Sequence, residues 1–164
     1  MNRWWGFRAV ANAVNLSTGA GLLLAALTRT PVQRGPEGLL LGTHYKARLP
    51  LAGAFTVGNV VFYRADRNFI DSRPQLLRHE AAHATQYAWC LGLPFLPLYA
   101  ACAAYSWWRT GNPGSRNFFE RSAGLERGGY RELPTIGRGR ALAHLAARPL
   151  FTPQSSSPQL RKHL

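Results

Sequence analysis

The pentapeptide His-Glu-Ala-Ala-His at residues 79–83 restricts the fold of this chain more than any other segment. Apolar or small side chains recur around it with helical spacing over residues 74–90, which predicts a helix. Positions four apart in a helix differ by about 40° around its axis, so His79 and His83 project from one face. Glu80 lies about 60° from His83 around the same axis. The chain is therefore expected to fold around one helix that presents two imidazoles together.

A third ligand is needed if these two imidazoles bind a catalytic metal ion. Two imidazoles on one helix face can share a zinc ion at about 2.0–2.1 Å per nitrogen, and a catalytic zinc site normally has three protein ligands. One class of zinc protease supplies a third histidine six residues after the pair, but that position holds Trp89. The later acidic side chains are Glu120, Glu126 and Glu132. We therefore expect the third ligand to be a carboxylate from a later helix.

Glu120 fits this requirement best among the three carboxylates. Ala123 and Gly124 lie on its own helical face, and such small residues would allow its helix to approach the first one closely. Glu126 lies about 120° away around the helix. Glu132 lies beyond the predicted end of that helix. The predicted ligands of a Zn²⁺ ion are therefore His79, His83 and Glu120.

This ligand set predicts a zinc metallopeptidase that acts on a peptide or protein substrate. Glu80 is expected to accept a proton from the water that zinc activates, and then to protonate the leaving amine. The candidate hydrogen-bond donors to the developing oxyanion are Tyr130, His144 and Arg116. A predicted strand at residues 55–63 could bind an extended peptide by strand addition.

Other classes of function remain open at this point. A domain without catalysis could keep zinc only to hold two helices together. Glu120 could instead form a surface ion pair with Arg116 or Arg121. If zinc only holds the two helices together, Glu80→Gln would leave the function intact, whereas His79→Ala would unfold the domain.

The charge of the chain favours anionic partners. The sequence has 20 Lys and Arg residues against 7 Asp and Glu residues, a formal net charge of +13. An anionic membrane surface is a candidate partner for such a protein. Nucleic acid is less favoured, because the arginines are scattered and no zinc-finger spacing is present. Cys90 and Cys102 are predicted to be buried free thiols, which fits a reducing compartment. A cytoplasmic location is therefore expected, and the basic charge adds association with a membrane surface as a candidate.

Two segments carry a pattern seen in a known group of domains. Residues 53–59 read Gly-Ala-Phe-Thr-Val-Gly-Asn, and residues 76–86 read Leu-Leu-Arg-His-Glu-Ala-Ala-His-Ala-Thr-Gln. They resemble the bacterial zincin-like, gluzincin-type domain of unknown function associated with contractile injection system proteins. The resemblance covers about residues 39–86 and implies a small sheet packed on the active-site helix. It also implies zinc as the metal, with the two histidines as ligands and Glu80 as the general base.

The predicted fold class is α+β, in which a small antiparallel sheet packs on the His-Glu-x-x-His helix beside further helices. Short β-like runs at residues 39–41, 47–49 and 55–63 supply the sheet. Ser72 is the predicted N-cap of the helix at residues 74–90. Ser115 is the predicted N-cap of the helix that carries Glu120 and ends at two glycines, Gly128 and Gly129.

The sequence divides into three predicted parts. Residues 1–36 are expected to form an N-terminal amphipathic helix and a loop, and residues 37–136 the zincin-like domain. Residues 137–164 are expected to form a basic helix and a disordered tail. The uncharged residues 84–108 could span a bilayer by length, but Gly92 and Pro94 interrupt them. A bent helical hairpin, buried or dipping into a membrane, is therefore expected there.

Overall fold

The computed structural model describes residues 3–50 and 52–137, so His144 and the predicted basic helix and tail lie outside the described residues. Along the chain the elements are α1 (Arg3–Val14), α2 (Ser17–Leu27), β1 (Val32–Arg34), η1 (Pro36–Gly38), β2 (Leu40–Gly42), β3 (Ala54–Val57), β4 (Val60–Tyr63), α3 (Arg67–Asp71), α4 (Pro74–Trp89), α5 (Phe95–Thr110) and α6 (Phe118–Ala123). The predicted α+β class is confirmed.

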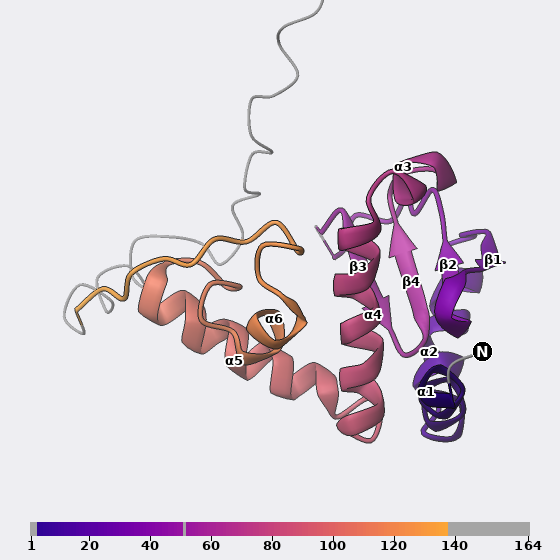
Figure 1. The fold of residues 1–164 in the computed structure, drawn as a ribbon, viewed down its shortest axis with the longest axis horizontal. Coiled ribbons are helices and arrows are strands. Elements are labelled where there is room, and N and C mark those ends of the chain that lie inside the picture. Colours follow the sequence, from indigo (N-terminus) through magenta and orange to yellow (C-terminus); the bar gives the residue numbers. More distant parts are fainter. Residues whose placement is uncertain (1–2, 51, 138–164) are drawn as a thin grey trace, which may run out of the picture.

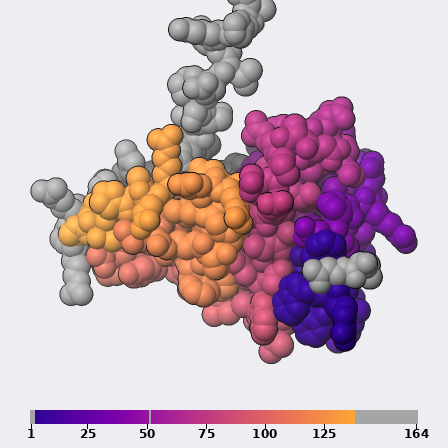
Figure 2. Space-filling model, in the orientation of Figure 1, coloured from indigo at the N-terminus to yellow at the C-terminus, as the bar shows by residue number. Residues whose placement is uncertain are grey.

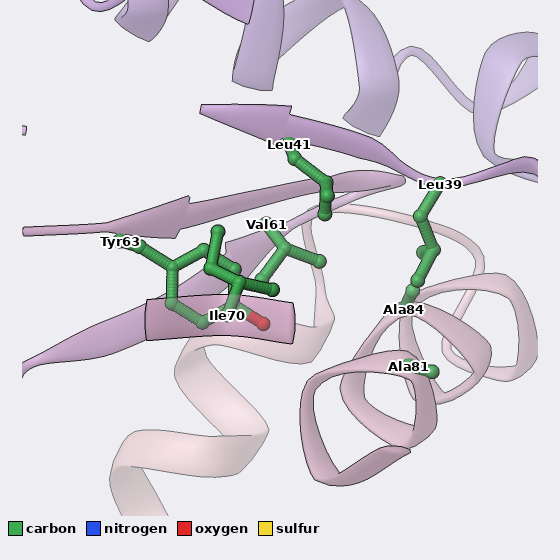
Figure 3. Packing of buried hydrophobic residues seen from close by; sticks show 7 residues of the cluster. All are labelled: Leu39, Leu41, Val61, Tyr63, Ile70, Ala81 and Ala84. Atoms are coloured by element: carbon green, nitrogen blue, oxygen red, sulfur yellow. The ribbon is translucent and has the colours of Figure 1, made fainter. Parts of the chain in front are cut away.

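The sheet has helices on both faces, and α4 separates it from α5 and α6 (Figure 1). Side chains alternate between the two faces of β4, and all four of its residues are buried. Val60 and Phe62 pack with Ala25 of α2, whereas Val61 and Tyr63 pack towards α4. Figure 3 shows the second cluster, which consists of Leu39, Leu41, Val61, Tyr63, Ile70, Ala81 and Ala84. Because β4 is buried on both faces, α4 is held in a fixed position against the sheet.

The strand order is β1-β2-β4-β3, and one strand pair differs from the prediction. The β1–β2 and β3–β4 pairs are antiparallel, but β2 runs parallel to β4, with Leu40 opposite Val60. The predicted strand at residues 47–49 is wrong, and β1 lies in a segment predicted to be a loop. These differences arise because pairing in a sheet depends on distant partners rather than on local β-propensity.

The predicted single strand at residues 55–63 is a hairpin of β3 and β4. The chain reverses at Gly58, which has a φ of +60°. A Cβ atom at Gly58 would lie 2.3 Å from the carbonyl carbon of Ser17 at the start of α2. Glycine is therefore needed there twice, for the turn and for the close approach of α2.

The predicted N-cap at Ser72 is wrong, although α4 itself covers nearly the predicted residues. Arg73 precedes α4 without a side-chain cap, and Pro74 occupies its first turn. Ser72 instead follows α3, a short helix that the sequence analysis did not predict. Asp66 begins α3 by accepting a hydrogen bond from the Phe69 amide at 2.9 Å.

The N-terminal segment forms two helices rather than one. The axes of α1 and α2 differ by 72°, and the chain bends at Leu16, which has a φ of +64°. Asn15 stabilises the bend, because its Oδ1 accepts a hydrogen bond from the Ser17 hydroxyl at 2.7 Å. Among the described residues no single helix is long and apolar enough to cross a membrane; α1 and α2 pass that test only as a bent pair.

The last two helices complete the structure around α4. Tyr87 of α4, Phe95 of α5 and Phe119 of α6 form a third apolar cluster. The helix that carries Glu120 is shorter than predicted, because Asn117 rather than Ser115 caps it and Gly124 follows its last residue. Asn117 Oδ1 accepts from the Phe119 amide at 3.0 Å, whereas the Ser115 hydroxyl accepts from the Leu133 amide. Cys90 and Cys102 are free and half-buried.

Candidate metal centre

The structure brings His79, His83 and Glu120 into one buried group between α4 and α6. The Nε2 atoms of the two histidines are 3.1 Å apart. Glu120 Oε2 lies 3.1 Å from His79 Nε2, and Glu120 Oε1 lies 3.7 Å from His83 Nε2. The alternative placement of Glu120 in a surface ion pair is wrong, because this carboxylate is only 2% exposed.

The Nδ1 atom of each imidazole contacts a fixed hydrogen-bond acceptor. His83 Nδ1 lies 2.8 Å from Gln86 Oε1, and His79 Nδ1 lies 3.1 Å from the carbonyl oxygen of Gly124. The Gln86 amide is oriented by its own NH₂ group, which donates to Phe119 O at 2.9 Å and to Ser122 Oγ at 2.9 Å. Both Nδ1 atoms are therefore assigned as donors, which leaves both Nε2 atoms as acceptors in the neutral rings.

Three acceptor groups consequently face one another inside the protein. Within the described part of the chain, Glu120 Oε2 is buried without a hydrogen-bond partner. Tetrahedral coordination with bonds of about 2.0–2.1 Å would separate ligand atoms by about 3.3 Å. His79 Nε2 lies 3.1 Å from His83 Nε2 and 3.1 Å from Glu120 Oε2, whereas the 3.7 Å separation joins His83 Nε2 to the other carboxylate oxygen, Oε1. The three side chains are therefore close to the spacing of zinc ligands, and imidazole and carboxylate are groups that bind zinc.

The charges of these groups shift one another's pKa. Burial alone would raise the pKa of Glu120, but the adjoining His79 and His83 side chains outweigh it and lower that pKa to about 2. Burial alone would lower the pKa of His83, but Glu120 and Glu80 outweigh it and raise that pKa. The group is thus arranged to hold positive charge.

Tyr99 of α5 holds the Glu120 carboxylate at Oε1, the oxygen that also faces His83. Its hydroxyl donates to Glu120 Oε1, and its ring centroid lies 6.1 Å from that of His83. Burial and the charge of Glu120 raise the pKa of Tyr99, so the phenol keeps its proton. Nothing in the uncharged sequence around Tyr99 marks it as a site residue, and only the folded chain brings it to Glu120.

Glu80 is buried on α4 beside the histidines and is hydrogen-bonded to the sheet. Its Oε2 accepts from the Thr56 hydroxyl of β3 at 2.7 Å. Burial raises the pKa of Glu80, while the histidines and the Thr56 hydrogen bond partly offset this effect. Thr56 lies in residues 53–59, one of the two segments that carry the resemblance described above. That segment was therefore the sequence signal that could have pointed to the contact between Thr56 and Glu80.

The segment after α6 covers the group from outside. A Cβ atom at Gly128 would lie 2.4 Å from His79 Cε1 and 2.5 Å from His79 Nε2. Only a residue without a side chain can therefore pass this close to the imidazole. The sequence suggested Gly128 as a helix stop, but its role in the structure is this close approach.

The remaining predicted site residues are distributed differently. Burial, and then the charges of Glu120 and Glu80, raise the pKa of Tyr130. Arg116 pairs with Glu132, with 3.2 Å between its Nη1 and Glu132 Oε1. Arg121 contacts the same carboxylate at 2.9 Å. The surface ion pairs suggested for Glu120 are thus formed by Glu132.

Compared with models of protein families, with curated proteins and with solved structures, this chain matches none.

Proposed function

We propose that this chain binds one zinc ion through His79, His83 and Glu120 and hydrolyses peptide bonds, as a small gluzincin-type metallopeptidase. The supporting observation is that three buried acceptors converge at metal-ligand spacing while the imidazole protons are held elsewhere. Among the described residues the group offers three ligands, and a tetrahedral ion bound by three side chains keeps one position for water or substrate.

The residues around the group suit this reaction. When bound, zinc supplies an activated water and polarises the carbonyl that is attacked. We assign Glu80 to take the water's proton at its carboxylate and to return it to the leaving amine. Tyr130 keeps its phenol proton because its pKa is raised, which suits a donor to the oxyanion. β3 is an outer strand of the sheet and carries Thr56, so an extended peptide could pair along it near Glu80.

One observation favours a second candidate, a zinc site that only stabilises the fold. The exposed fractions of His79, His83 and Glu120 are 3%, 7% and 2%. Such burial is typical of structural metal sites, which are closed to substrate. In that case zinc would fasten α6 to α4 without turnover.

The distinguishing experiment combines metal analysis, thermal unfolding and cleavage of an internally quenched peptide library. The wild type is compared with Glu80→Gln, which is close in shape and leaves the three ligands in place, and with Glu120→Ala. A peptidase requires stoichiometric zinc in the wild type and in Glu80→Gln, with turnover reduced by about 10²–10⁴-fold in the latter. Glu120→Ala should lose zinc and activity together.

Each other result has a defined meaning. If chelation lowers the unfolding temperature while no variant and no wild type cleaves any peptide, the structural role is correct and the peptidase is rejected. If the wild type binds no zinc, or if Glu120→Ala retains it with unchanged affinity, the ligand assignment is wrong.

A further inference from the structure

Helix α1 turns two polar side chains, Arg8 and Asn12, inward. Arg8 is 2% exposed, and its guanidinium donates to the carbonyl oxygens of Ala81 at 3.3 Å and Glu37 at 2.6 Å. Asn12 is fully buried and donates to the carbonyl oxygen of Ala84 at 2.8 Å. These bonds attach α1 to the backbone of α4 through polar contacts.

The outward face of the same helix is apolar. Its exposed side chains include Trp4, Phe7, Val10 and Val14, spaced three or four residues apart along one stripe. Val14 is 76% exposed. A surface helix of a water-soluble domain normally shows the opposite arrangement, with the apolar stripe facing the core. The outward face of α1 is therefore suited to an apolar environment.

Helix α2 repeats this arrangement. Ser17, Gly21 and Ala25 face the interior, where Gly21 lies against the hairpin closely enough that a Cβ would be 2.6 Å from Val57 O. Leu24 packs against the core cluster of Ala25, Val60 and Phe62, whereas the other three leucines of α2, Leu22, Leu23 and Leu27, are exposed. Small residues thus make most of the contact with the sheet, while three large apolar residues of α2 face the solvent.

The turn between α4 and α5 extends the same surface. Trp89 and Leu91 are 70% and 78% exposed, and further exposed leucines follow at Leu93, Leu96 and Leu98. The ring centroids of Trp89 and Trp4 are 5.9 Å apart. A Cβ at Gly92 would lie 2.8 Å from Asn15 O, in the turn between α1 and α2. The N-terminal helices and the α4–α5 turn therefore adjoin, as Figure 2 shows along the lower side of the molecule.

Charge surrounds this apolar face and is absent from its middle. The sequence has no Asp, Glu, Lys or Arg between Arg8 and Arg29, and none between Glu80 and Arg109. Arg3 begins α1 and Arg29 follows α2, and both are exposed. Cations thus lie at two helix ends beside the face.

We propose that this apolar face, formed by the outer sides of α1, α2, the α4–α5 turn and the start of α5, docks on an anionic phospholipid bilayer. Exposed leucine and phenylalanine side chains would enter the acyl region, with Trp4 and Trp89 at the level of the headgroups. The bordering arginines would contact lipid phosphates. A second copy of the chain is the weaker fit, because two molecules with a net charge of +13 repel each other. This inference goes beyond the proposed peptidase and requires no bound metal.

The test is flotation of the full chain with vesicles of phosphatidylcholine, with and without phosphatidylserine. We expect the wild type to float with the anionic vesicles and to bind less to the neutral ones. Leu23→Glu on α2 and Leu98→Glu on α5 should each weaken binding by at least about tenfold, because each removes one inserted side chain. The matched control is Leu49→Glu, which changes a leucine of 69% exposure outside this face and should leave binding unchanged.

Two further measurements keep the outcome decisive. Circular dichroism shows that each variant is folded, and quenching of tryptophan emission by brominated acyl chains tests insertion without any substitution. Lack of wild-type flotation, lack of quenching, or equal binding of the face variants and Leu49→Glu would overturn the proposal. A wild-type dimer that Leu23→Glu converts to a monomer would also overturn it, because the face would then be covered by a second copy.

Discussion

Replacing Gln86 by alanine should weaken zinc binding although Gln86 is not one of the proposed ligands. The side chain lies between His83 Nδ1, 2.8 Å from its Oε1, and α6, where its NH₂ group contacts Phe119 O and Ser122 Oγ at 2.9 Å each. Without it the His83 ring loses the acceptor that assigns its proton to Nδ1. The imidazole could then rotate or carry its proton on Nε2, where it would block the metal.

The size of the effect follows from these three contacts. Loss of a residue that orients a metal-binding histidine typically costs 10–100-fold in metal affinity, which is about 1.4–2.7 kcal/mol. Loss of three hydrogen bonds at about 0.5–1.5 kcal/mol each should also destabilise the metal-free protein by about 1.5–4.5 kcal/mol. For a chain of this size the unfolding temperature would fall by about 2–4 °C per kcal/mol.

The assay is competition for zinc against a chelating dye, with thermal unfolding in the presence and absence of zinc. Thr85→Ala is the matched control, since the Thr85 hydroxyl donates only to the Ala81 carbonyl within α4 at 3.1 Å. It should leave zinc affinity unchanged. If folded Gln86→Ala binds zinc as tightly as the control, the assignment of the histidine protons to Nδ1 is wrong. The claim that both Nε2 atoms face the site as acceptors would then fail.

Three further predictions concern the same group. Tyr99→Phe removes the hydrogen bond to Glu120 Oε1 and should lower zinc affinity by about tenfold, as dye competition would show. Zinc occupancy should fall with decreasing pH, because protonated His83 cannot bind a metal, and its raised pKa places this loss at a higher pH than for an ordinary histidine; equilibrium dialysis across pH 5–8 checks this sign. Gly128→Ala places a methyl group 2.5 Å from His79 Nε2, so it should displace the segment after α6 or abolish zinc binding. Unchanged metal content together with an unchanged unfolding temperature would contradict this packing.

The extent of α4 followed from sequence because it depends on local periodicity. Apolar spacing and Pro74 predicted its residues to within one position at its C-terminal end, and the spacing of His79 and His83 predicted that they share a face. Glu120 was identified by elimination among three carboxylates. Gly124, four residues later, does lie where α6 meets α4, but it contributes its carbonyl oxygen, which His79 Nδ1 contacts. In each case the signal lies within a few residues of the feature.

Strand pairing and helix ends were predicted less well, since distant parts of the chain compete for them. The parallel pairing of β2 with β4 depends on a hairpin formed later in the sequence. Ser115 was a reasonable cap by residue type, but the structure uses its hydroxyl for the Leu133 amide and caps α6 with Asn117. The single helix expected at the N-terminus bends at Leu16 so that Ser17 can approach Gly58.

Helical periodicity was enough to identify the pair of imidazoles on one helix face and the three acids that could join them. The contacts of Tyr99 with Glu120 and of Thr56 with Glu80, and the inward position of Asn12 on α1, could be known only from the folded chain. Helical spacing is fixed by the backbone alone, whereas these contacts join residues separated by 20 or more positions and exist only when the core is packed.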